Sequence, residues 1–300
     1  IELKKFENVH HRYFPFDVEF LMKGFIEVWR PNYIFLVDSE IWPNLIILAK
    51  KKKIPLALIN ARLTSKSFKR WIMFPETAKK IFNSFDLCLV SNNETKKYLE
   101  KLNARNIFFK GNLKLTNEIV KDKINNINEK FFTAKRFWIA ASVHRGEEIF
   151  CLKTHKIIKE KYKDLVTFIV PRHIHNSKNI AVSSKRLNLK TQILNKEETI
   201  FDDREIVVVN SFGVLQNYFK YAKSVFIGKS VLKKFKDKGG QNPIDAAKLG
   251  CKIYHGPYVY NFKEIYDILN KRNIAKKIET CEDLSENLIH DLSIPQKSET

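Results

Sequence analysis

Short apolar runs alternate with longer segments of mixed polarity along the first part of the chain. The run Tyr33–Val37 is apolar throughout, and similar runs recur after it. Continuous apolar runs of this length are typical of parallel strands that are buried on both faces. The expected strands are residues 33–37, 56–60, 87–91 and 107–110, the expected helices are 42–52 and 66–83, and Asn92-Asn93-Glu94 signals the start of another helix.

A second series begins after residues 117–135, which are polar and are expected to form a helix and a connector. Its expected strands are 137–141, 166–170, 206–210, 224–228 and 252–254, and its expected helices are 146–161, 243–249 and 261–270. Strands that alternate with helices imply open parallel sheets, and 300 residues suffice for two domains. We therefore predict an α/β protein of two doubly wound, Rossmann-like domains, 1–116 and 117–300, that face each other across a cleft.

The net charge of +21 is the strongest compositional feature. A charge of this size favours an anionic partner, which can be a nucleic acid, an acidic lipid surface or a phosphorylated substrate. Solvated surface lysines, as in the run Lys50–Lys53, explain it equally well. The charge alone therefore does not choose between partners.

Four cysteines are scattered along the chain without a CxxC pair or a His at metal spacing, which fits reduced thiols better than disulfides or a zinc site. No apolar run reaches the roughly 20 residues that span a bilayer, and no signal peptide opens the chain. Because the first residue is Ile1 and not Met, we expect the true start of the protein to lie upstream.

Two acidic residues follow the first expected strand, at the edge where doubly wound folds bind ligands. Capping of the next helix by Asp38 or Ser39 explains Asp38 as well as a functional role does. Glu40 is the better candidate, because a carboxylate can stabilise a cationic sugar transition state. In the segment Gly111–Lys114, Lys114 can neutralise a departing phosphate, although a surface turn explains the same residues.

In the second half, strand 137–141 runs into a hydroxyl, a glycine and a helix start, which together can bind an anion. The candidates are Ser142, Gly146 and His144, whose ring can donate to a phosphate or sugar oxygen. A helix start in which Glu147 and Glu148 complement the macrodipole is the alternative, but it leaves His144 unexplained.

Arg172 follows strand 166–170 directly after Pro171 and can bind a phosphate through two parallel hydrogen bonds. We favour this role over a plain surface position, because the strand is of the buried type. After strand 206–210, Gly213 would allow a base or ribose to approach the backbone, and a plain loop glycine is an equal explanation.

Segment 239–245 joins a glycine pair to a helix start whose amides can face a phosphate, while Asp245 can reach a ribose hydroxyl. A helix cap by Asn242, with Pro243 at the first helical position, explains part of the segment but not Gly-Gly-Gln. The candidates here are Gly240, Gln241, Asn242, Pro243, Ile244 and Asp245. We expect no metal site, because no DxD motif occurs, and no hydrolase, because the nucleophile elbow is absent.

The stretches DSEIWPN, NARL, GNLK, ASVHRGEE, VPRH, FIGKS, GGQNPIDAA and GPYVYNF occur here in one order. Each is weak alone, but the ordered set, from about Phe14 to Asn270, resembles the Kdo transferases of lipopolysaccharide synthesis. The resemblance implies a metal-independent, inverting GT-B glycosyltransferase without a cofactor. Its implied substrates are CMP-Kdo as donor and a lipid A precursor, lipid IVA, as acceptor, at the cytoplasmic face of the inner membrane.

Matching motif positions imply roles for individual residues. Pro171 and Arg172 are implied to hold CMP, as are the segments Phe212–Val214 and Asn242–Asp245. Glu40 and Lys114 match the acid and the lysine that family members place around the transition state.

The sequence departs from the family pattern at four places. The family's general base is a Glu in a Gly-Glu motif that has no match in this chain, so we expect it upstream together with a membrane anchor. Val214 stands where Glu is frequent, which removes a side-chain contact. Asp245 stands where Glu is usual, which shortens its reach by one methylene, and Val143 replaces a Thr, which removes a hydroxyl from the anion loop.

The positive charge fits an anionic membrane surface, since each basic residue near such a surface contributes about 1 kcal/mol. The expected contact is the segment Phe68–Phe74 with Lys66, Lys69 and Arg70. Inward packing of its aromatic residues, as in an ordinary amphipathic helix, is the alternative.

Two other functions are left open by the residues. One is a GT-B transferase that uses another sugar nucleotide. The other is an inactive or basic module that binds nucleic acid in a salt-sensitive way. Because no recognised RNA-binding or DNA-binding motif occurs, we expect no nucleic-acid partner.

Overall fold

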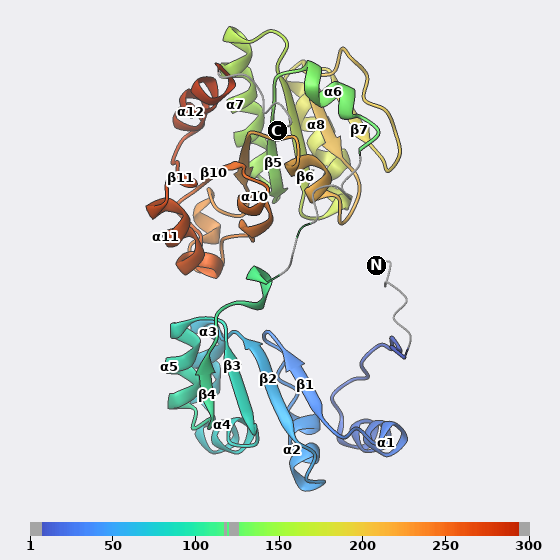
Figure 1. The fold of residues 1–300 in the computed structure, drawn as a ribbon, viewed down its shortest axis with the longest axis vertical. Coiled ribbons are helices and arrows are strands. Elements are labelled where there is room, and N and C mark those ends of the chain that lie inside the picture. Colours follow the sequence, from blue (N-terminus) through green and yellow to red (C-terminus); the bar gives the residue numbers. More distant parts are fainter. Residues whose placement is uncertain (1–7, 117–118, 120–125, 294–300) are drawn as a thin grey trace. The chain divides into compact units, whose positions relative to one another are not determined.

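The computed structural model describes residues 8–116, 119 and 126–293 of the chain, except for the side chain of Lys114. The chain divides into two compact units, unit 1 (Ile1–Asn117) and unit 2 (Glu118–Thr300), each built on a parallel sheet (Figure 1). The predicted α/β class with parallel sheets is therefore confirmed.

Unit 1 holds a four-stranded sheet of order β1-β2-β3-β4, and each strand is parallel to its neighbour. Its elements are α1 (Glu19–Trp29), β1 (Ile34–Val37), α2 (Pro43–Lys51), β2 (Leu56–Ala61), α3 (Ser65–Ile72), α4 (Pro75–Phe82), β3 (Leu87–Val90), α5 (Asn93–Lys101), β4 (Ile107–Phe109) and a 3-10 turn (Leu113–Leu115). Buried residues of the helices and strands form one apolar cluster, in which Met22, Ile46 and Phe82 are fully buried.

Two expectations for unit 1 are wrong. The helix expected over 66–83 is two helices, because Pro75 cannot continue α3 and instead occupies the start of α4. The strand expected to be buried on both faces, β1, lies at the edge of the sheet, where Phe35 is 60% and Val37 47% exposed. The apolar run predicted a strand correctly, but it carried no information about which strands are central.

Unit 2 holds a seven-stranded parallel sheet of order β11-β10-β9-β5-β6-β8-β7. The strands are β5 (Phe137–Val143), β6 (Val166–Pro171), β7 (Thr191–Leu194), β8 (Ile206–Val209), β9 (Ser224–Ile227), β10 (Lys252–His255) and β11 (Ala275–Lys277). After β5, the chain places β6, β7 and β8 on one side of it and then β9, β10 and β11 on the other side. This reversal is a topological switch point, the place where doubly wound sheets bind ligands.

Helices cover both faces of this sheet. The elements are α6 (Glu129–Ala134), α7 (Glu147–Lys161), α8 (Ser177–Arg186), α9 (Leu215–Phe219), α10 (Ile244–Lys248), α11 (Lys263–Lys271) and α12 (Cys281–Ser293), with 3-10 turns at Ile174–Asn176, Lys233–Phe235 and Tyr260–Phe262. Residues of α7, α8 and α12 share one apolar cluster, and residues of α6, α9, α10 and α11 share the other. Trp138 and Phe137 of β5 lie in different clusters, as the alternation of side chains along a strand requires.

A buried carboxylate fixes α12 to the sheet. Asp291 accepts hydrogen bonds from Tyr254 Oη at 2.5 Å, Ser224 Oγ at 2.7 Å and Lys252 Nζ at 3.0 Å. Burial opposes ionisation, but these three donors lower the pKa of Asp291 below its ordinary value. The helix is therefore held by charge-assisted hydrogen bonds as well as by its apolar face.

A buried histidine makes the stability of unit 2 sensitive to acid. His155 on α7 is fully buried, and its Nδ1 lies 2.8 Å from Thr167 Oγ1. Burial, reinforced by the charge of Lys159, lowers the pKa of His155 from 6.5 to about 4. The unfolded chain binds this proton near pH 6.5 and the folded chain only near pH 4, so stability falls as the pH drops between these values. At pH 5 the loss amounts to about 2 kcal/mol.

We therefore expect His155→Gln to weaken the pH dependence of unfolding. Urea unfolding at pH 7 and pH 5 measures it, with the exposed His175→Gln as the control. The free energy of unfolding of the wild type and the control should fall by about 2 kcal/mol more between these pH values than that of His155→Gln. Equal decreases in all three proteins would contradict the assignment.

Candidate functional site

The candidate nucleotide-binding residues of unit 2 follow strands β5, β6, β8 and β9. His144 comes directly after β5, Arg172 directly after β6 and Phe212 shortly after β8, while segment 239–245 lies between β9 and β10. Because the strands are parallel, their carboxyl ends share one edge of the sheet. The structure thus places these candidates at the same edge, on both sides of the switch point.

His144 lies among positively charged groups at this edge. Its half-buried ring has Nε2 3.0 Å from Gln241 Nε2, so the neutral ring can accept from the Gln241 amide. Its pKa is lowered from 6.5 to about 4 by burial first and then by the charges of Lys229, His173, Arg172 and Lys234. Near pH 7 the ring is therefore neutral, and the positive charges of Lys229, Arg172 and Lys234 around it favour an anion at this edge.

The β5 end carries a local irregularity at Ser142. This residue has a φ of 55°, and the register of β5 against β6 shifts between Ala141 and Val143. Such a bulge re-aims the chain that follows it. The backbone N–H of Arg172 donates to Val143 O at 3.0 Å, so the bulge also holds the residue that follows β6.

The amides of the β5–α7 loop bind the protein's own carboxylates. His144 N donates to Glu147 Oε2 at 3.1 Å, and Gly146 N donates to Glu148 Oε2 at 2.5 Å. Two of the amides on which the predicted anion site relied are therefore already satisfied. Gly146 itself is the N-cap of α7 with a φ of 97°, a conformation that favours glycine.

The predicted cap of α10 is shifted by one residue. Pro243 is the N-cap residue and not the first helical residue, and Asn242 Oδ1 accepts from Ile244 N at 3.0 Å. Asp245 in the first turn accepts from Gln216 Nε2 on α9 at 3.2 Å. Because α9 directly follows the loop Ser211–Val214, this bond links Asp245 to the loop after β8.

The glycine pair is explained by packing between loops. A Cβ on Gly239 would overlap the carbonyl oxygen of Tyr258 and lie 2.7 and 2.8 Å from those of Phe235 and Lys229. Gly240 has a φ of 89°, and its N–H donates to Lys229 O at 2.7 Å. The Gly-Gly signal therefore marks the close approach of three backbone segments, a requirement that the helix start alone did not explain.

In unit 1 the capping of α2 by Asp38 or Ser39, which was the alternative to a functional role of Asp38, is not what the structure shows. The carboxylate of Asp17 accepts from Asn44 N at 2.9 Å and from Leu45 N at 3.0 Å, and so satisfies the first amides of α2. Ser39 Oγ instead donates to Arg62 O at 2.7 Å. The sequence did not indicate Asp17 as the cap of α2, because Asp17 precedes α1 and lies far from α2 along the chain.

Asp38 has a different role, which brings the two predicted catalytic segments together. Its Oδ1 accepts from Asn60 Nδ2 at 2.5 Å, and Asn60 Oδ1 accepts from Leu113 N at 3.1 Å. The exposed Glu40 thus lies in a loop tied through Asn60 to the 3-10 turn that carries Lys114. The side chain of Lys114 lies outside the described part of the structure, so its predicted role stays a prediction.

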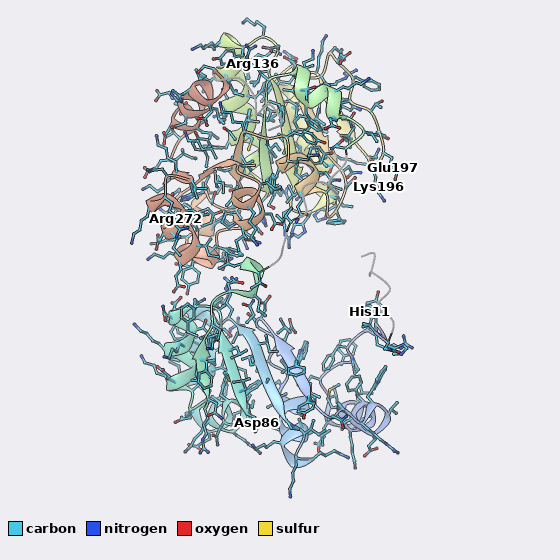
Figure 2. The ribbon with its side chains drawn as sticks, viewed as in Figure 1. His11, Asp86, Arg136, Lys196, Glu197 and Arg272 are labelled. Carbon is cyan, nitrogen blue, oxygen red and sulfur yellow. The ribbon has the colours of Figure 1, made fainter. Side chains whose placement is uncertain are left out.

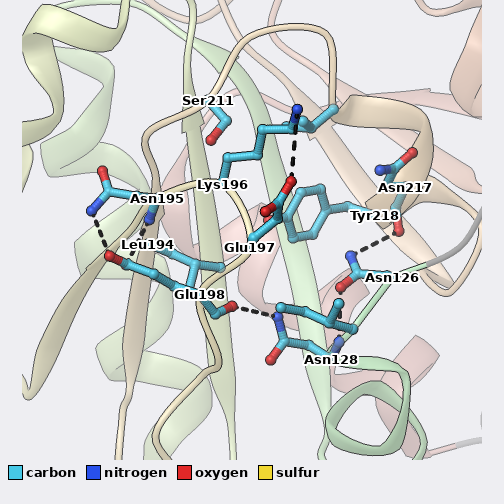
Figure 3. Close-up of a pocket in the computed structure, with 12 residues that line it drawn as sticks. Asn126, Asn128, Leu194, Asn195, Lys196, Glu197, Glu198, Ser211, Asn217 and Tyr218 are labelled. Atoms are coloured by element: carbon cyan, nitrogen blue, oxygen red, sulfur yellow. Dashed lines mark hydrogen bonds and ion pairs between the residues drawn. The ribbon is translucent and has the colours of Figure 1, made fainter.

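A shallow pocket of about 240 Å³ borders the loop after β8 (Figure 3). It is lined mainly by polar residues that are bonded to one another, as in the bonds from Asn128 Nδ2 to Glu198 O at 3.0 Å and from Asn195 Nδ2 to Glu198 Oε1 at 2.8 Å. Of the predicted site residues, Val214 alone lines it. Phe212 is exposed, and Gly213 has a φ of 74° with open space beside it.

Two further findings concern metal binding and membrane-spanning helices. Within the described ranges, no group of three or more His, Cys, Asp or Glu residues is arranged to hold a metal ion. Among the helices of those same ranges, none is both long enough and apolar enough to cross a membrane.

Comparison with known proteins places these observations in context. The sequence family described as 3-deoxy-D-manno-octulosonic-acid transferase (kdotransferase) matches residues 2–117. A probable mitochondrial 3-deoxy-D-manno-octulosonic acid transferase of Arabidopsis thaliana is 30% identical over 98% of this chain and 68% of its own length. The 3-deoxy-D-manno-octulosonic acid transferase of Haemophilus influenzae is 27% identical over 95% of this chain and 67% of its own length.

Solved structures show the same fold. The C-terminal CMP-Kdo binding domain of WaaA from Acinetobacter baumannii matches 54% of this chain and 83% of its own, with a TM-score of 0.50 and 21% identity. A putative UDP-N-acetylglucosamine 2-epimerase from Listeria monocytogenes matches 92% of this chain and 70% of its own, with a TM-score of 0.61 and 14% identity. These likenesses confirm the predicted GT-B fold class.

Sequence reasoning missed one residue at this edge. Glu147 is completely buried, and its carboxylate accepts backbone N–H groups on both sides of the switch point. The sequence suggested only a favourable charge at a helix start. Three of its partners lie 82–84 residues further along the chain, so no local pattern indicates them.

Proposed function

The chain belongs to the 3-deoxy-D-manno-octulosonic acid (Kdo) transferase family of glycosyltransferases, and from this premise we propose that it transfers Kdo from CMP-Kdo to a lipid A precursor in lipopolysaccharide synthesis. The observation that carries the proposal is the 30% identity to a Kdo transferase over 98% of the chain. The positive edge of the seven-stranded sheet supports it, because a CMP-sugar offers a phosphate to such a surface.

The proposed reaction is a single displacement with inversion. A hydroxyl of the acceptor attacks the anomeric carbon of Kdo, its proton passes to a general base, and the bond from that carbon to the phosphate oxygen of CMP breaks. Arg172 stabilises the negative charge that grows on the phosphate, and Lys114 contributes a second positive charge. Asp245 holds the ribose, and Glu40 stabilises the positive charge on the sugar ring.

The proposed donor is tested by turnover with a panel of sugar nucleotides. The purified full-length protein, with the upstream segment in which we expect the general base, is incubated with lipid IVA and with CMP-Kdo, a UDP-sugar or a GDP-sugar, and the glycosylated lipid is measured by mass spectrometry. We expect glycosylated lipid with CMP-Kdo as the donor and none with the UDP-sugar or the GDP-sugar. Product from a UDP- or GDP-sugar, without turnover of CMP-Kdo, would show that the chain uses another donor.

We further propose that unit 1 contacts an anionic membrane through the segment Ile72–Phe74. Phe74 is 63% and Met73 71% exposed, next to the exposed basic residues of α3 and α4. The basic residues are Lys66, Lys69, Arg70, Lys79 and Lys80. Exposed apolar side chains flanked along the chain by basic residues are typical of a segment that binds an anionic interface.

The aromatic residues of the segment Phe68–Phe74 differ in whether they pack inward or are exposed. Trp71 packs edge-on against Phe82 with ring centroids 5.2 Å apart, and Phe68 stacks on Tyr98 at 4.3 Å. Both therefore pack inward on unit 1, as in an ordinary amphipathic helix. Phe74 is the aromatic residue of the segment that is exposed to an outside partner.

We expect Phe74→Asp to weaken binding to vesicles that contain phosphatidylglycerol by about tenfold, because it removes apolar contact and adds a repelled charge. Co-sedimentation with the vesicles measures the effect. The matched control is Ile268→Asp, a half-exposed apolar residue on α11 of unit 2. Equal losses in the two variants, or none in Phe74→Asp, would contradict this contact.

A further inference from the structure

The carboxylate of Glu147 bridges the two halves of the seven-stranded sheet at the switch point. Glu147 is the first residue of α7, after β5, and it is completely buried. Its Oε2 accepts from His144 N at 3.1 Å and from Lys229 N at 2.6 Å, and its Oε1 accepts from Ser230 N at 2.9 Å and Val231 N at 3.2 Å. One side chain therefore joins the loop after β5 to the loop after β9.

The geometry requires a carboxylate. Four N–H donors need four lone pairs on two oxygens, which an ionised carboxylate has and an amide does not. The fit is tight, because a Cβ on Gly228 would lie 3.0 Å from Glu147 Oε2 and 2.6 Å from Ser142 O. Burial raises the pKa of Glu147, and the donated N–H groups act against that rise.

The segment held by Glu147 is bonded in turn to the other loops of the edge. Lys229 O accepts from Gly240 N at 2.7 Å, which fixes the glycine pair. Ser230 O accepts from Tyr258 N at 2.9 Å, and Ser230 Oγ accepts from Gly256 N at 2.9 Å. Release of the segment 229–231 would therefore loosen the glycine loop and the loop after β10 as well.

We propose that Glu147 is a positioning residue for the donor: through the bonds to residues 144 and 229–231, here called the Glu147 clamp, it holds the loops after β5 and β9 in the arrangement that binds the nucleotide phosphate. This inference rests on the proposed function. Glu147 does not touch the phosphate, because the bonds to the four N–H groups occupy its oxygens. The clamp acts by keeping His144, Lys229 and the glycine loop in place before the ligand arrives, and pre-organisation of this kind raises affinity.

The neighbouring Glu148 offers a matched comparison. Its Oε2 accepts from Gly146 N within its own loop, whereas the bonds of Glu147 cross the switch point. Glu148→Gln therefore removes the same charge from the same helix turn without opening the clamp. We expect the dissociation constant for CMP, measured by calorimetry, to rise at least tenfold in Glu147→Gln and by less than about twofold in Glu148→Gln.

Two further readouts separate positioning from stability. The KM for CMP-Kdo should rise in Glu147→Gln while the KM for the lipid acceptor stays unchanged, a split that general destabilisation does not produce. Hydrogen exchange of residues 229–231 should be faster in Glu147→Gln than in the wild type. A folded Glu147→Gln protein with the CMP affinity of the wild type would overturn the proposal.

Two other outcomes, a Glu147→Gln protein that does not fold and a wild type that binds UMP in place of CMP, also bear on the Glu147 clamp. If Glu147→Gln does not fold, hydrogen exchange of the wild type decides: CMP must slow exchange at residues 229–231, and unchanged exchange contradicts the clamp. If the wild type binds UMP and not CMP, the proposed donor is wrong. The comparison of the Glu147 and Glu148 variants with UMP then still tests the clamp.

Discussion

Replacement of Arg172 by Ala is expected to lower kcat/KM for CMP-Kdo by roughly 10²–10³-fold, the range found when one donor to a developing negative charge is removed. Arg172 follows β6 directly, and its backbone N–H is bonded to Val143 O at the end of β5. Its charge is close enough to His144 to lower the pKa of that ring. Arg172 is exposed at this edge, and we propose that its guanidinium binds the phosphate of the departing CMP.

Two variants define the role of Arg172. Arg172→Lys keeps the charge but loses the planar pair of donors, so we expect it to recover part of the activity and not all of it. Arg186→Ala removes an exposed arginine at the end of α8 and should leave kcat/KM unchanged. Steady-state kinetics with CMP-Kdo measures all three proteins. An Arg172→Ala protein that is as active as Arg186→Ala would show that Arg172 is only a surface residue.

Substitution of Gly239 by Ala is expected to cause the largest structural effect. The added Cβ would overlap Tyr258 O and crowd two other carbonyl oxygens, and backbone atoms cannot move aside as a flexible side chain can. Overpacking typically costs 1–3 kcal/mol, and a backbone clash of this kind is expected to cost at least about 3 kcal/mol. The glycine loop should shift, and the affinity for CMP should fall with it.

Gly24→Ala is the matched substitution. Gly24 lies within α1, and among the described residues nothing outside the adjacent helix backbone lies within 4 Å of the position of its Cβ. There Ala should stabilise unit 1 by about 0.5–1 kcal/mol, because it favours the helix. Thermal unfolding followed by circular dichroism should therefore show opposite changes for the two variants. A Gly239→Ala protein with the stability and CMP affinity of the wild type would contradict the close packing of these loops.

The positive charge of the chain has more than one origin, as the sequence allowed. Figure 2 shows Arg136 and Arg272 at separate places on unit 2, and Arg136 is paired with Asp164 at 2.8 Å. Arg136 is therefore surface charge that a neighbouring carboxylate balances, and an exposed ion pair of this kind contributes little to stability. The lysines and the arginine around His144 are different, because their charges act on one half-buried ring.

The pattern of the sequence was sufficient for nine of the eleven strands in the described ranges and for the sheet edge at which the candidate residues lie. The apolar runs at β5, β6, β8 and β9 mark fully buried strands, and the polar residues after them lie at the carboxyl edge. The short strands β7 and β11 were missed. β7 alternates buried and half-buried residues over four positions, and β11 is polar after Ala275, so neither forms an apolar run.

The missed parts of the site depend on contacts between distant segments. Asp17 caps α2 from before α1, and Glu147 receives three of its bonds from residues 229–231. Both acids look like ordinary helix-start residues or surface charges in the sequence. The partners of Glu147 become clear only from the order of the strands, which brings β9 beside β5, and those of Asp17 only from the packing of the segment before α1 against the start of α2.

We propose that the carboxyl edge of the seven-stranded sheet binds the donor nucleotide, and a crystal structure of the protein with CMP would show whether it does. We expect the phosphate within hydrogen-bond distance of Arg172 and beside His144 and Gly240, with the ribose at Asp245. A CMP molecule bound elsewhere, for example in the pocket lined by Asn195 and Asn217 and without contact to Arg172, would contradict the claim.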